Sequence, residues 1–498
     1  MKLARLIEDL EPVSTRGNTG IEVKGIAVDS RRVSPGDLFV AVPGLRHDGA
    51  EFVSEARSRG AVAMVAGEFT SAVNGHLPQV RVKDPRRALG LLANRFFDYP
   101  AAALKMIGVT GTNGKTTVSL LAREVFEDAG IPTGLLGTIY YGIGPRRLPS
   151  RLTTPEPPRL QELLAEMKRA RLTHAILEVS SHAVVQERLA GIEFSTGVFT
   201  NLSREHLDYH RTIDEYRAAK LRFFSAFRQG LIPPEKKTVI VNLDDGLAQR
   251  ILTALPVPAV TYGFSPRADL SATRLELQQD GSRFTVRGRD GSFPVRINMP
   301  GRHNVANALA VVALALSEGI APERISRALE RCPGIPGRLE RVETGRGFDL
   351  FVDYAHTPDG LENVLKTLRR LGRRRLIVVF GCGGDRDPGK RPLMGRAAAR
   401  WADRTIITSD NPRSEDPAAI IAAVRAGIPR GTRGVKTIED RRAAIAEACR
   451  AARPGDAVLI AGKGHEREQI FADRVIPFDD REVARKILAD LPKKFTGK

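Results

Sequence analysis

Cysteine is scarce in this sequence. The 498 residues contain three, Cys332, Cys382 and Cys449, and no two of them have the spacing of a CxxC pair. This argues against a disulfide framework and against a structural zinc site. Aromatic residues make up only 6% of the chain, which is little for a protein that stacks on unpaired bases. The composition therefore favours a reduced, intracellular protein.

Long apolar runs are also absent. The longest, residues 306–316, is too short to span a bilayer and is typical of a buried helix. The amino-terminal segment carries charges within its first nine residues and has no continuous apolar core, unlike a secretory signal. We expect a soluble cytoplasmic protein that does not insert into membranes.

Positive charge is abundant: 77 Lys+Arg against 58 Asp+Glu give a net charge of +19. Such an excess raises the question of nucleic acid, but the arginines are spread along the chain and no nucleic-acid module is recognisable. A basic field also attracts small anionic substrates. We expect no nucleic-acid partner, and the charge alone leaves the function open.

The length predicts two or three domains. Residues 21–100 alternate short apolar runs with turns, which predicts a small α/β unit with strands near 26–28, 38–42 and 62–66. A second unit opens with the run 104–109 and a helix over 115–129. Further runs and helical patterns follow, as in a parallel sheet covered by helices. Short strands over 258–298 predict an antiparallel insertion, and 304–331 are helical.

A Pro/Gly-rich linker over 332–337 precedes the third unit. Its apolar runs, at 350–352, 376–380, 405–408 and 457–461, alternate with helical sequence and predict a doubly wound, Rossmann-like α/β domain. The predicted fold class is therefore α/β in three domains. These are an N-terminal domain (1–100), a central P-loop-type ATPase domain with a parallel sheet (101–334), and a C-terminal domain (335–498).

A glycine-rich loop follows the run 104–109 and leads into a helix. Its glycines let successive backbone N–H groups face one centre, and a lysine and a threonine can meet the outer phosphates and Mg²⁺. The generic spacing needs glycine at position 109, where Val109 stands, so this is a tightened variant. The loop predicts ATP binding by Gly111, Thr112, Asn113, Gly114, Lys115, Thr116 and Thr117.

A phosphate loop needs metal partners. Glu178 ends an apolar strand, where a carboxylate can hold Mg²⁺ directly or through water. A helix-capping acid is the alternative. His206 lies in a polar stretch after the run 197–199 and is a second candidate contact, although a lone histidine can also be structural.

Several motifs occur in the order found in one family: GTNGKTT, EVSSHA, TNLSREHLDYH, YRAAKLRFF, PGRHNVANALA, PGRLE, DYAHTPDG and GKGHE. In these the chain resembles the Mur ligases, and among them the MurE subfamily of UDP-N-acetylmuramoyl-tripeptide synthetases. The likeness extends from residues 29–31 to 464–466. It implies an ATP- and Mg²⁺-dependent ligase of peptidoglycan precursor synthesis. In the reaction that the resemblance implies, ATP phosphorylates the D-Glu side-chain carboxylate of UDP-MurNAc-L-Ala-D-Glu, and an amine then attacks the acyl phosphate. We expect a monomer acting on small molecules.

The resemblance also implies roles for single residues. Lys220 matches a lysine that is carbamylated in the family, giving a carboxylate-like group that can face Mg²⁺, whereas a surface helix lysine is the plain alternative. Asn304 and Arg338 match positions near the adenine and phosphates, and Asp353 and His356 lie in the matching motif of the last domain. The acceptor's peptide and sugar match Thr153, Thr154, Ser180, Gln186 and Arg188. Its UDP group matches Val28, Ser30, Leu45, Arg46 and His47.

The incoming amino acid is suggested by the sequence DNPR, which in the family marks enzymes that take meso-diaminopimelate instead of lysine. Arg413 offers a planar fork to the second carboxylate of diaminopimelate and would repel the ammonium of lysine. A structural ion pair is the alternative role for Arg413. The expected contacts are Arg386, Asp410, Asn411, Pro412, Arg413, Gly462 and Glu466.

Two other functions stay open. One is another amide ligase of the same superfamily, such as the D-Ala-D-Ala-adding MurF or a folylpolyglutamate synthase. The other is a basic nucleotide-binding protein that associates with nucleic acid and has lost catalysis. The presence of Lys115, Lys220 and Glu178 argues against that loss.

Overall fold

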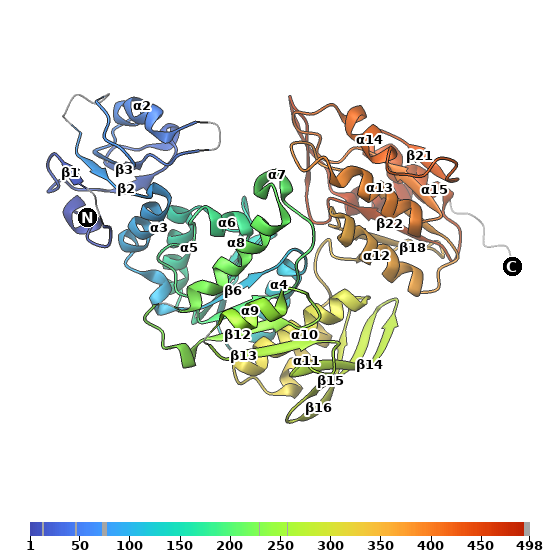
Figure 1. Cartoon of the computed structure of the whole chain (residues 1–498). Coiled ribbons are helices and arrows are strands. Elements are labelled where there is room, and N and C mark those ends of the chain that lie inside the picture. Colours follow the sequence, from blue (N-terminus) through green and yellow to red (C-terminus); the bar gives the residue numbers. More distant parts are fainter. Residues whose placement is uncertain (12–13, 45–46, 72–76, 229, 256, 493–498) are drawn as a thin grey trace.

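Three large β-sheets organise the described part of the chain. The structure, a computed structural model, describes residues 1–11, 14–44, 47–71, 77–228, 230–255 and 257–492. Each sheet forms its own lobe, and the first and third lobes both stand on the upper side of the central one (Figure 1). In the described part of the chain, no helix has the length and apolar character that a membrane span requires. The predicted α/β class in three parts is confirmed.

The first sheet has the strand order β1-β5-β4-β3-β2. Its parallel strands are β2 (Gly25–Ala27), β3 (Asp37–Val40), β4 (Ala63–Ala66) and β5 (Gln79–Arg81), and β1 (Ser14–Arg16) runs antiparallel at the edge. The helices are α1 (Leu3–Leu6), α2 (Val53–Ser58) and α3 (Pro85–Phe96). Asp84 starts α3 by accepting from two backbone N–H groups, and Pro85 occupies its first turn. The three strands predicted here are present.

The central sheet has eleven strands in the order β16-β15-β14-β13-β12-β11-β6-β10-β7-β8-β9. Its parallel part comprises β6 (Lys105–Thr110), β7 (Thr133–Leu136), β10 (His174–Glu178), β11 (Thr196–Phe199), β12 (Thr238–Asn242) and β13 (Ala259–Gly263). One face packs on α4 (Lys115–Asp128), α10 (Arg302–Ser317) and α11 (Pro322–Arg331). The other face packs on α5 (Pro157–Arg169), α8 (Ile213–Ser225) and α9 (Ala248–Ala254). Because β6 lies between β10 and β11, the segments that follow these three strands meet at one sheet edge.

The predicted antiparallel insertion over 258–298 is partly wrong. Strands β14 (Leu270–Gln278), β15 (Gly281–Gly288) and β16 (Gly291–Ile297) are antiparallel, but β13 pairs with β12 in parallel and extends the main sheet. The direction of a strand depends on the sheet edge with which it pairs. The composition of an apolar run does not contain that information. A hairpin of β8 (Tyr140–Ile143) and β9 (Arg146–Pro149) closes the opposite edge.

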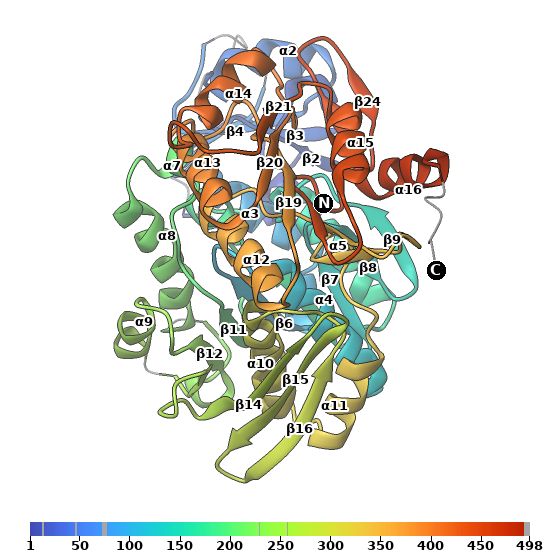
Figure 2. The same cartoon turned by 90° about the vertical axis from the view of Figure 1, so that its right-hand side faces the viewer.

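The third sheet has the order β17-β18-β22-β19-β20-β21. Its parallel strands are β18 (Asp349–Asp353), β19 (Leu376–Phe380), β20 (Arg404–Ile407), β21 (Val435–Thr437) and β22 (Ala457–Ala461), with β17 (Glu340–Val342) antiparallel at the edge. Helices α12 (Pro358–Arg370), α13 (Lys390–Trp401) and α14 (Pro417–Arg425) cover one face, and α15 (Arg441–Ala451) and α16 (Asp480–Asp490) the other (Figure 2). A small hairpin joins β23 (Glu468–Ile470) to β24 (Val475–Pro477). The predicted doubly wound arrangement is confirmed.

Candidate active site

The glycine-rich loop joins β6 to α4. Gly111 and Gly114 have φ values of +151° and +89°, a region that side chains disfavour, so glycine permits the tight path. The segment after β11 holds the loop from outside: Asn113 N donates to Asn201 Oδ1 at 2.9 Å, and Thr200 Oγ1 donates to Asn113 O at 2.6 Å. Lys115 Nζ donates to the carbonyl oxygens of Gly111 and Thr112, each at 2.8 Å.

Helix α10 covers the start of α4. A Cβ atom at Gly114 would collide with the side-chain oxygen of Asn307. Asn304 stands one turn earlier on α10, and its Nδ2 donates to Pro300 O at 2.9 Å. It also accepts a long hydrogen bond, 3.5 Å, from Asn307 Nδ2. Asn304 therefore lies near the loop, and Asn307 stands between Asn304 and Gly114.

Thr116 and Glu178 meet directly. Thr116 Oγ1 donates to Glu178 Oε2 at 3.0 Å, and Thr138 donates to the same carboxylate through its N–H at 3.0 Å and its hydroxyl at 2.8 Å. Arg338, from the start of the third lobe, donates from Nη2 to Thr116 Oγ1 at 3.2 Å. Glu178 is buried and ends β10, so its carboxylate is a fixed part of the loop's surroundings.

Lys220 is buried on α8 beside this loop, with 1% of its surface exposed. Its Nζ lies 4.5 Å from the ring centroid of Tyr216, and within the described residues it forms no ion pair or hydrogen bond. Burial and the neighbouring positive charge of Lys115 hold the pKa of Lys220 well below its usual range. A surface helix lysine is excluded by this burial.

His206 follows β11 with φ of +57°, outside the usual range for a side chain. Burial lowers the pKa of its imidazole to about 3, so the ring is neutral near pH 7 and a ring nitrogen can act as a ligand. The adjacent Glu205 was not predicted. Its Oε1 accepts from His356 Nε2 at 3.1 Å. Its buried Oε2 lies 3.5 Å from His206 Nε2 and has no hydrogen-bond partner among the residues that the structure describes. Although burial acts in the opposite direction, the nearby imidazoles and Lys115 hold the pKa of Glu205 well below its usual range.

The predicted acceptor residues form a continuous hydrogen-bonded patch next to Glu178. Thr154 Oγ1 donates to the backbone oxygen of Glu178 at 2.7 Å and accepts from Ser180 N at 3.1 Å. Arg188 Nη1 donates to Thr154 O at 2.8 Å. Gln186 Oε1 accepts from Arg188, and Thr153 shares a 3.1 Å hydrogen bond with Thr138. Ser180 also caps the short helix α6 (Ser181–Val185).

The third lobe gathers another polar cluster where β19, β20 and β22 end. Asn411 Nδ2 donates to Glu466 Oε2 at 2.8 Å, and Gly462 packs against Asp410 with φ of +113°. Arg413 Nη1 donates to Gly384 O at 2.7 Å. Within the described residues Arg413 forms no ion pair, which argues against a structural ion-pair role. Pro412 lies between Asn411 and Arg413, next to Gly384.

Arg386 is exposed on the loop after β19. Burial and the positive charge of Arg386 lower the pKa of Arg413. Both arginine side chains lie near Gly383, and the charge of Glu466 acts on Arg413. Positive and negative groups in one cluster suit a ligand that carries both charges.

Comparison with known proteins decides the family. The Mur ligase family catalytic domain matches residues 22–97, the Mur ligase middle domain matches 109–315, and the Mur ligase glutamate ligase domain matches 337–464. The chain belongs to the Mur ligase family.

Two relatives of this Mur ligase cover nearly its whole length. Both are named UDP-N-acetylmuramoyl-L-alanyl-D-glutamate–2,6-diaminopimelate ligase. The one from Syntrophomonas wolfei is 45% identical over 98% of this chain and 99% of its own. The one from Listeria monocytogenes serotype 4b is 42% identical over 97% and 98%. A solved structure with the same name is 33% identical, with a TM-score of 0.68 over 98% of this chain and 99% of that one.

The residues predicted to bind the UDP group lie in the first lobe of the Mur ligase, whereas the phosphate loop lies in the central lobe. Ser30 is buried and its hydroxyl donates to Glu55 Oε2 at 2.7 Å, and Val28 is half-buried just after β2. His47 is exposed beside Glu51, with 3.8 Å between Nδ1 and the carboxylate. Leu45 and Arg46 lie outside the described residues.

Asp353 and His356 have different partners. The Asp353 carboxylate accepts from Leu339 N at 2.6 Å and Ala355 N at 2.7 Å, so it shapes the turn that follows β18. His356 instead faces the central lobe through Glu205.

The oxygen atoms around the loop fit Mg²⁺. Thr116, Glu178 and the unpartnered oxygen of Glu205 are hard ligands of the kind that Mg²⁺ prefers. Among the described residues, no three His, Cys, Asp or Glu side chains form a metal site by themselves. The protein would therefore hold the ion together with phosphate oxygens and water, as is usual for Mg²⁺.

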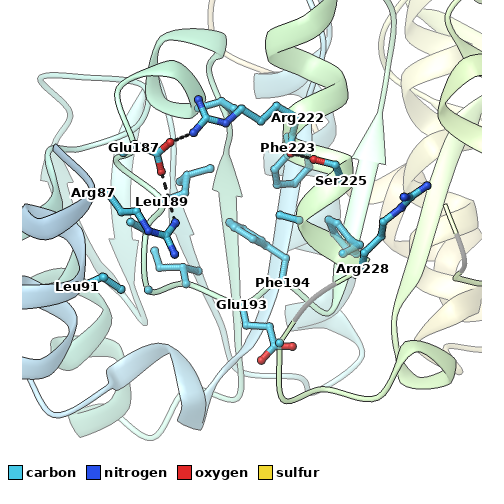
Figure 3. A pocket seen from close by; sticks show the side chains of 17 residues that line it. Arg87, Leu91, Glu187, Leu189, Glu193, Phe194, Arg222, Phe223, Ser225 and Arg228 are labelled. Atoms are coloured by element: carbon cyan, nitrogen blue, oxygen red, sulfur yellow. Dashed lines mark hydrogen bonds and ion pairs between the residues drawn. The ribbon is translucent and has the colours of Figure 1, made fainter. Parts of the chain in front are cut away.

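The structure contains a further cavity with a volume of about 610 Å³, and Figure 3 shows side chains that line it. It is bounded by α3, the segment after α6, and the end of α8. Its apolar wall includes Phe194 and Phe223, and Glu187 pairs with Arg222 and Arg87 at its rim. Its lining includes none of the predicted site residues.

Proposed function

We propose that this Mur ligase adds meso-2,6-diaminopimelate to the D-Glu side-chain carboxylate of UDP-MurNAc-L-Ala-D-Glu at the expense of ATP. The observation that carries the proposal is the identity of 45% over 98% of the chain to a relative named for this reaction. The intact loop Asp410–Arg413, with a guanidinium that forms no ion pair among the described residues, supports diaminopimelate as the amino acid.

The first step needs ATP held with its terminal phosphoryl group facing the acceptor. Backbone N–H groups of residues 111–117 and the start of α4 suit the phosphates, and Lys115 can exchange its two carbonyl contacts for phosphate oxygens. A carboxylate oxygen of D-Glu attacks the γ-phosphorus and ADP leaves. Arg188, next to Thr154, suits the acceptor's carboxylates.

Thr116, Glu178, His206 and Lys220 would hold Mg²⁺, with Glu205 as an additional ligand. The ion supplies neutralisation of phosphate charge when bound. The neutral amine of Lys220 can attack CO₂, forming an N–C bond and losing one proton to give a carbamate anion. Burial favours the neutral amine that this reaction requires.

The second step needs the amino group of diaminopimelate at the acyl phosphate. Its nitrogen attacks the acyl carbon, phosphate leaves, and the nitrogen loses its proton to water. Arg413 and Arg386 suit the distal carboxylate, and Glu466 suits the distal ammonium. Lysine, which lacks that carboxylate, leaves the guanidinium of Arg413 facing an ammonium.

Each lobe would bind a different substrate. Residues 1–100 would bind the UDP end, 101–334 ATP, and 335–498 the amino acid; the three sheets, whose strands fall inside these ranges, support this division. Cys332, Cys382 and Cys449 are buried free thiols, which supports action in the reducing cytoplasm. The monomeric state remains a prediction.

The test is ADP release with UDP-MurNAc-L-Ala-D-Glu and either diaminopimelate, lysine or D-Ala-D-Ala. We expect ADP and amide to form in equal amounts with diaminopimelate and at least about tenfold more slowly with lysine. Lys115→Ala should abolish both products while leaving the circular dichroism spectrum unchanged. ADP release that requires D-Ala-D-Ala would favour the MurF reaction, and no coupled release with any amine would overturn the proposal.

A further inference from the structure

A lysine with no assigned role stands at the centre of the third-lobe cluster. Lys463 follows β22 between Gly462 and Gly464, and its side chain is 0% exposed. Its Nζ donates to Asn411 Oδ1 at 2.9 Å and to Glu466 Oε2 at 3.0 Å. A buried ammonium is costly unless it is paired and hydrogen-bonded, so this placement needs a compensating role.

Lys463 settles the orientation of the Asn411 amide. An ammonium only donates hydrogen bonds, so the amide atom facing it must be the oxygen. The backbone N–H of Ile470 donates to the same oxygen at 3.1 Å. The amide nitrogen must then point the other way, where it donates to Glu466 Oε2 at 2.8 Å. Asn411 is 3% exposed, and its oxygen already accepts two hydrogen bonds.

Glu466 is held through one oxygen only. Its Oε2 accepts from both Lys463 and Asn411. In the described part of the chain, Oε1 receives no hydrogen bond from the protein, and the side chain remains 31% exposed. One carboxylate oxygen is therefore fixed inside the protein, and the other is free to meet a ligand.

The charges nearby are consistent with this arrangement. Burial alone would raise the pKa of Asp410, but the positive charges of Lys463 and Arg441 outweigh it, so that this pKa lies below its usual value. The buried cluster thus favours the ionised form of Asp410 next to Lys463. A carboxylate such as that of Glu466 can pair with an incoming ammonium.

We propose that Lys463 is a positioning residue for amino-acid selection, which aligns Asn411 and Glu466 so that Glu466 Oε1 faces the distal ammonium of the incoming diamino acid. On this view, Asn411 acts on the amino acid through Glu466. The inference rests on the proposed function, because it takes the third-lobe cluster as the amino-acid site.

The test compares Lys463→Met with Lys237→Met. Lys237 is an equally buried lysine of the central lobe, paired with Glu193 at 2.9 Å. We expect Lys463→Met to raise the KM for diaminopimelate by about 10- to 100-fold, because charge-assisted hydrogen bonds that fix a ligand contact are lost. The KM values for ATP and the acceptor should stay within about twofold. Lys237→Met should lower the melting temperature without this selective change.

A double-mutant cycle with Asn411→Leu tests whether the two residues act together. Lys463→Met and Asn411→Leu should each raise the diaminopimelate KM, and the double variant should be no worse than the poorer single variant. Additive effects would overturn the proposal, as would an equal change of all three KM values. If Lys463→Met does not fold, Asn411→Leu carries the test, and an unchanged diaminopimelate KM in it would overturn the proposal.

The wild-type control separates the two claims. If the wild-type protein does not couple diaminopimelate to ADP release, the proposed function fails. If it does, and Lys463→Met behaves as wild type, only the role of Lys463 fails.

Discussion

A buried lysine without an ion pair is chemically unusual, and Lys220 forms none with the residues that the structure describes. Desolvation favours its neutral form, and the approach of Lys115 acts in the same direction. The amine of Lys220 therefore loses its proton at a lower pH than the amine of an exposed lysine does. Addition of CO₂ to this neutral amine would give a carbamate anion, whose charge Lys115 can balance.

We therefore expect Lys220→Ala to reduce turnover at least about 1,000-fold while keeping the fold, and added formate or acetate to restore part of it by supplying a carboxylate. The measurement is ADP release with and without the added anion. Lys168→Ala, which removes an exposed lysine paired with Asp98 at 2.9 Å, should leave turnover unchanged. Full activity of Lys220→Ala without added carboxylate would contradict the carbamate.

Single residues were predictable from the sequence where a local motif surrounds them. Lys115 and Thr116 follow from their loop, and Glu178 from its place at a strand end. Glu205 and Lys463 were missed, although both stand inside motifs that the sequence displays. Their partners His356 and Asn411 are 151 and 52 positions away, so only the fold shows the contacts.

Among the elements, α10 leaves no room for a side chain at Gly114 of the phosphate loop, because Asn307 of α10 lies against this glycine. We expect Gly114→Ala to abolish ATP-dependent turnover, because its Cβ would collide with Asn307 in addition to the strain at φ of +89°. Gly130, at the other end of α4, has φ of +78° and no atom within 4 Å of a Cβ. Gly130→Ala should therefore cost only about 1–2 kcal/mol of stability and leave ATP turnover intact. Equal activity in the two variants, measured as ADP release, would contradict the role of α10.

The elements that the sequence predicted are the long apolar strands and the helix after the phosphate loop. The short strands β1, β5, β8 and β9, at or next to a sheet edge, were not predicted, because their residues are stabilised by a neighbouring strand and carry little pattern of their own. The parallel pairing of β13 was missed for the same reason: it depends on the free edge of β12.

In the whole molecule, the active-site residues come from different lobes, and sequence patterns do not show how the lobes meet. Hydrogen bonds join the central and third lobes near the phosphate loop: Glu205 with His356 at 3.1 Å, and Thr116 with Arg338 at 3.2 Å. Each places a group of the third lobe next to the candidate ATP site. The lobe arrangement and the nucleotide site are therefore energetically linked.

We expect His356→Ala to loosen this arrangement. A hydrogen bond to a charged group contributes about 1.5–3 kcal/mol, enough to shift an equilibrium between lobe positions by about 10- to 100-fold. Small-angle scattering should then show a larger radius of gyration, and kcat should fall more than the KM for the acceptor changes. His174→Ala is the matched control, because it removes a His–Glu contact, 3.4 Å to Glu318, that lies within the central lobe. Unchanged scattering in His356→Ala would show that Glu205 and His356 do not hold the lobes together, whatever happens to turnover.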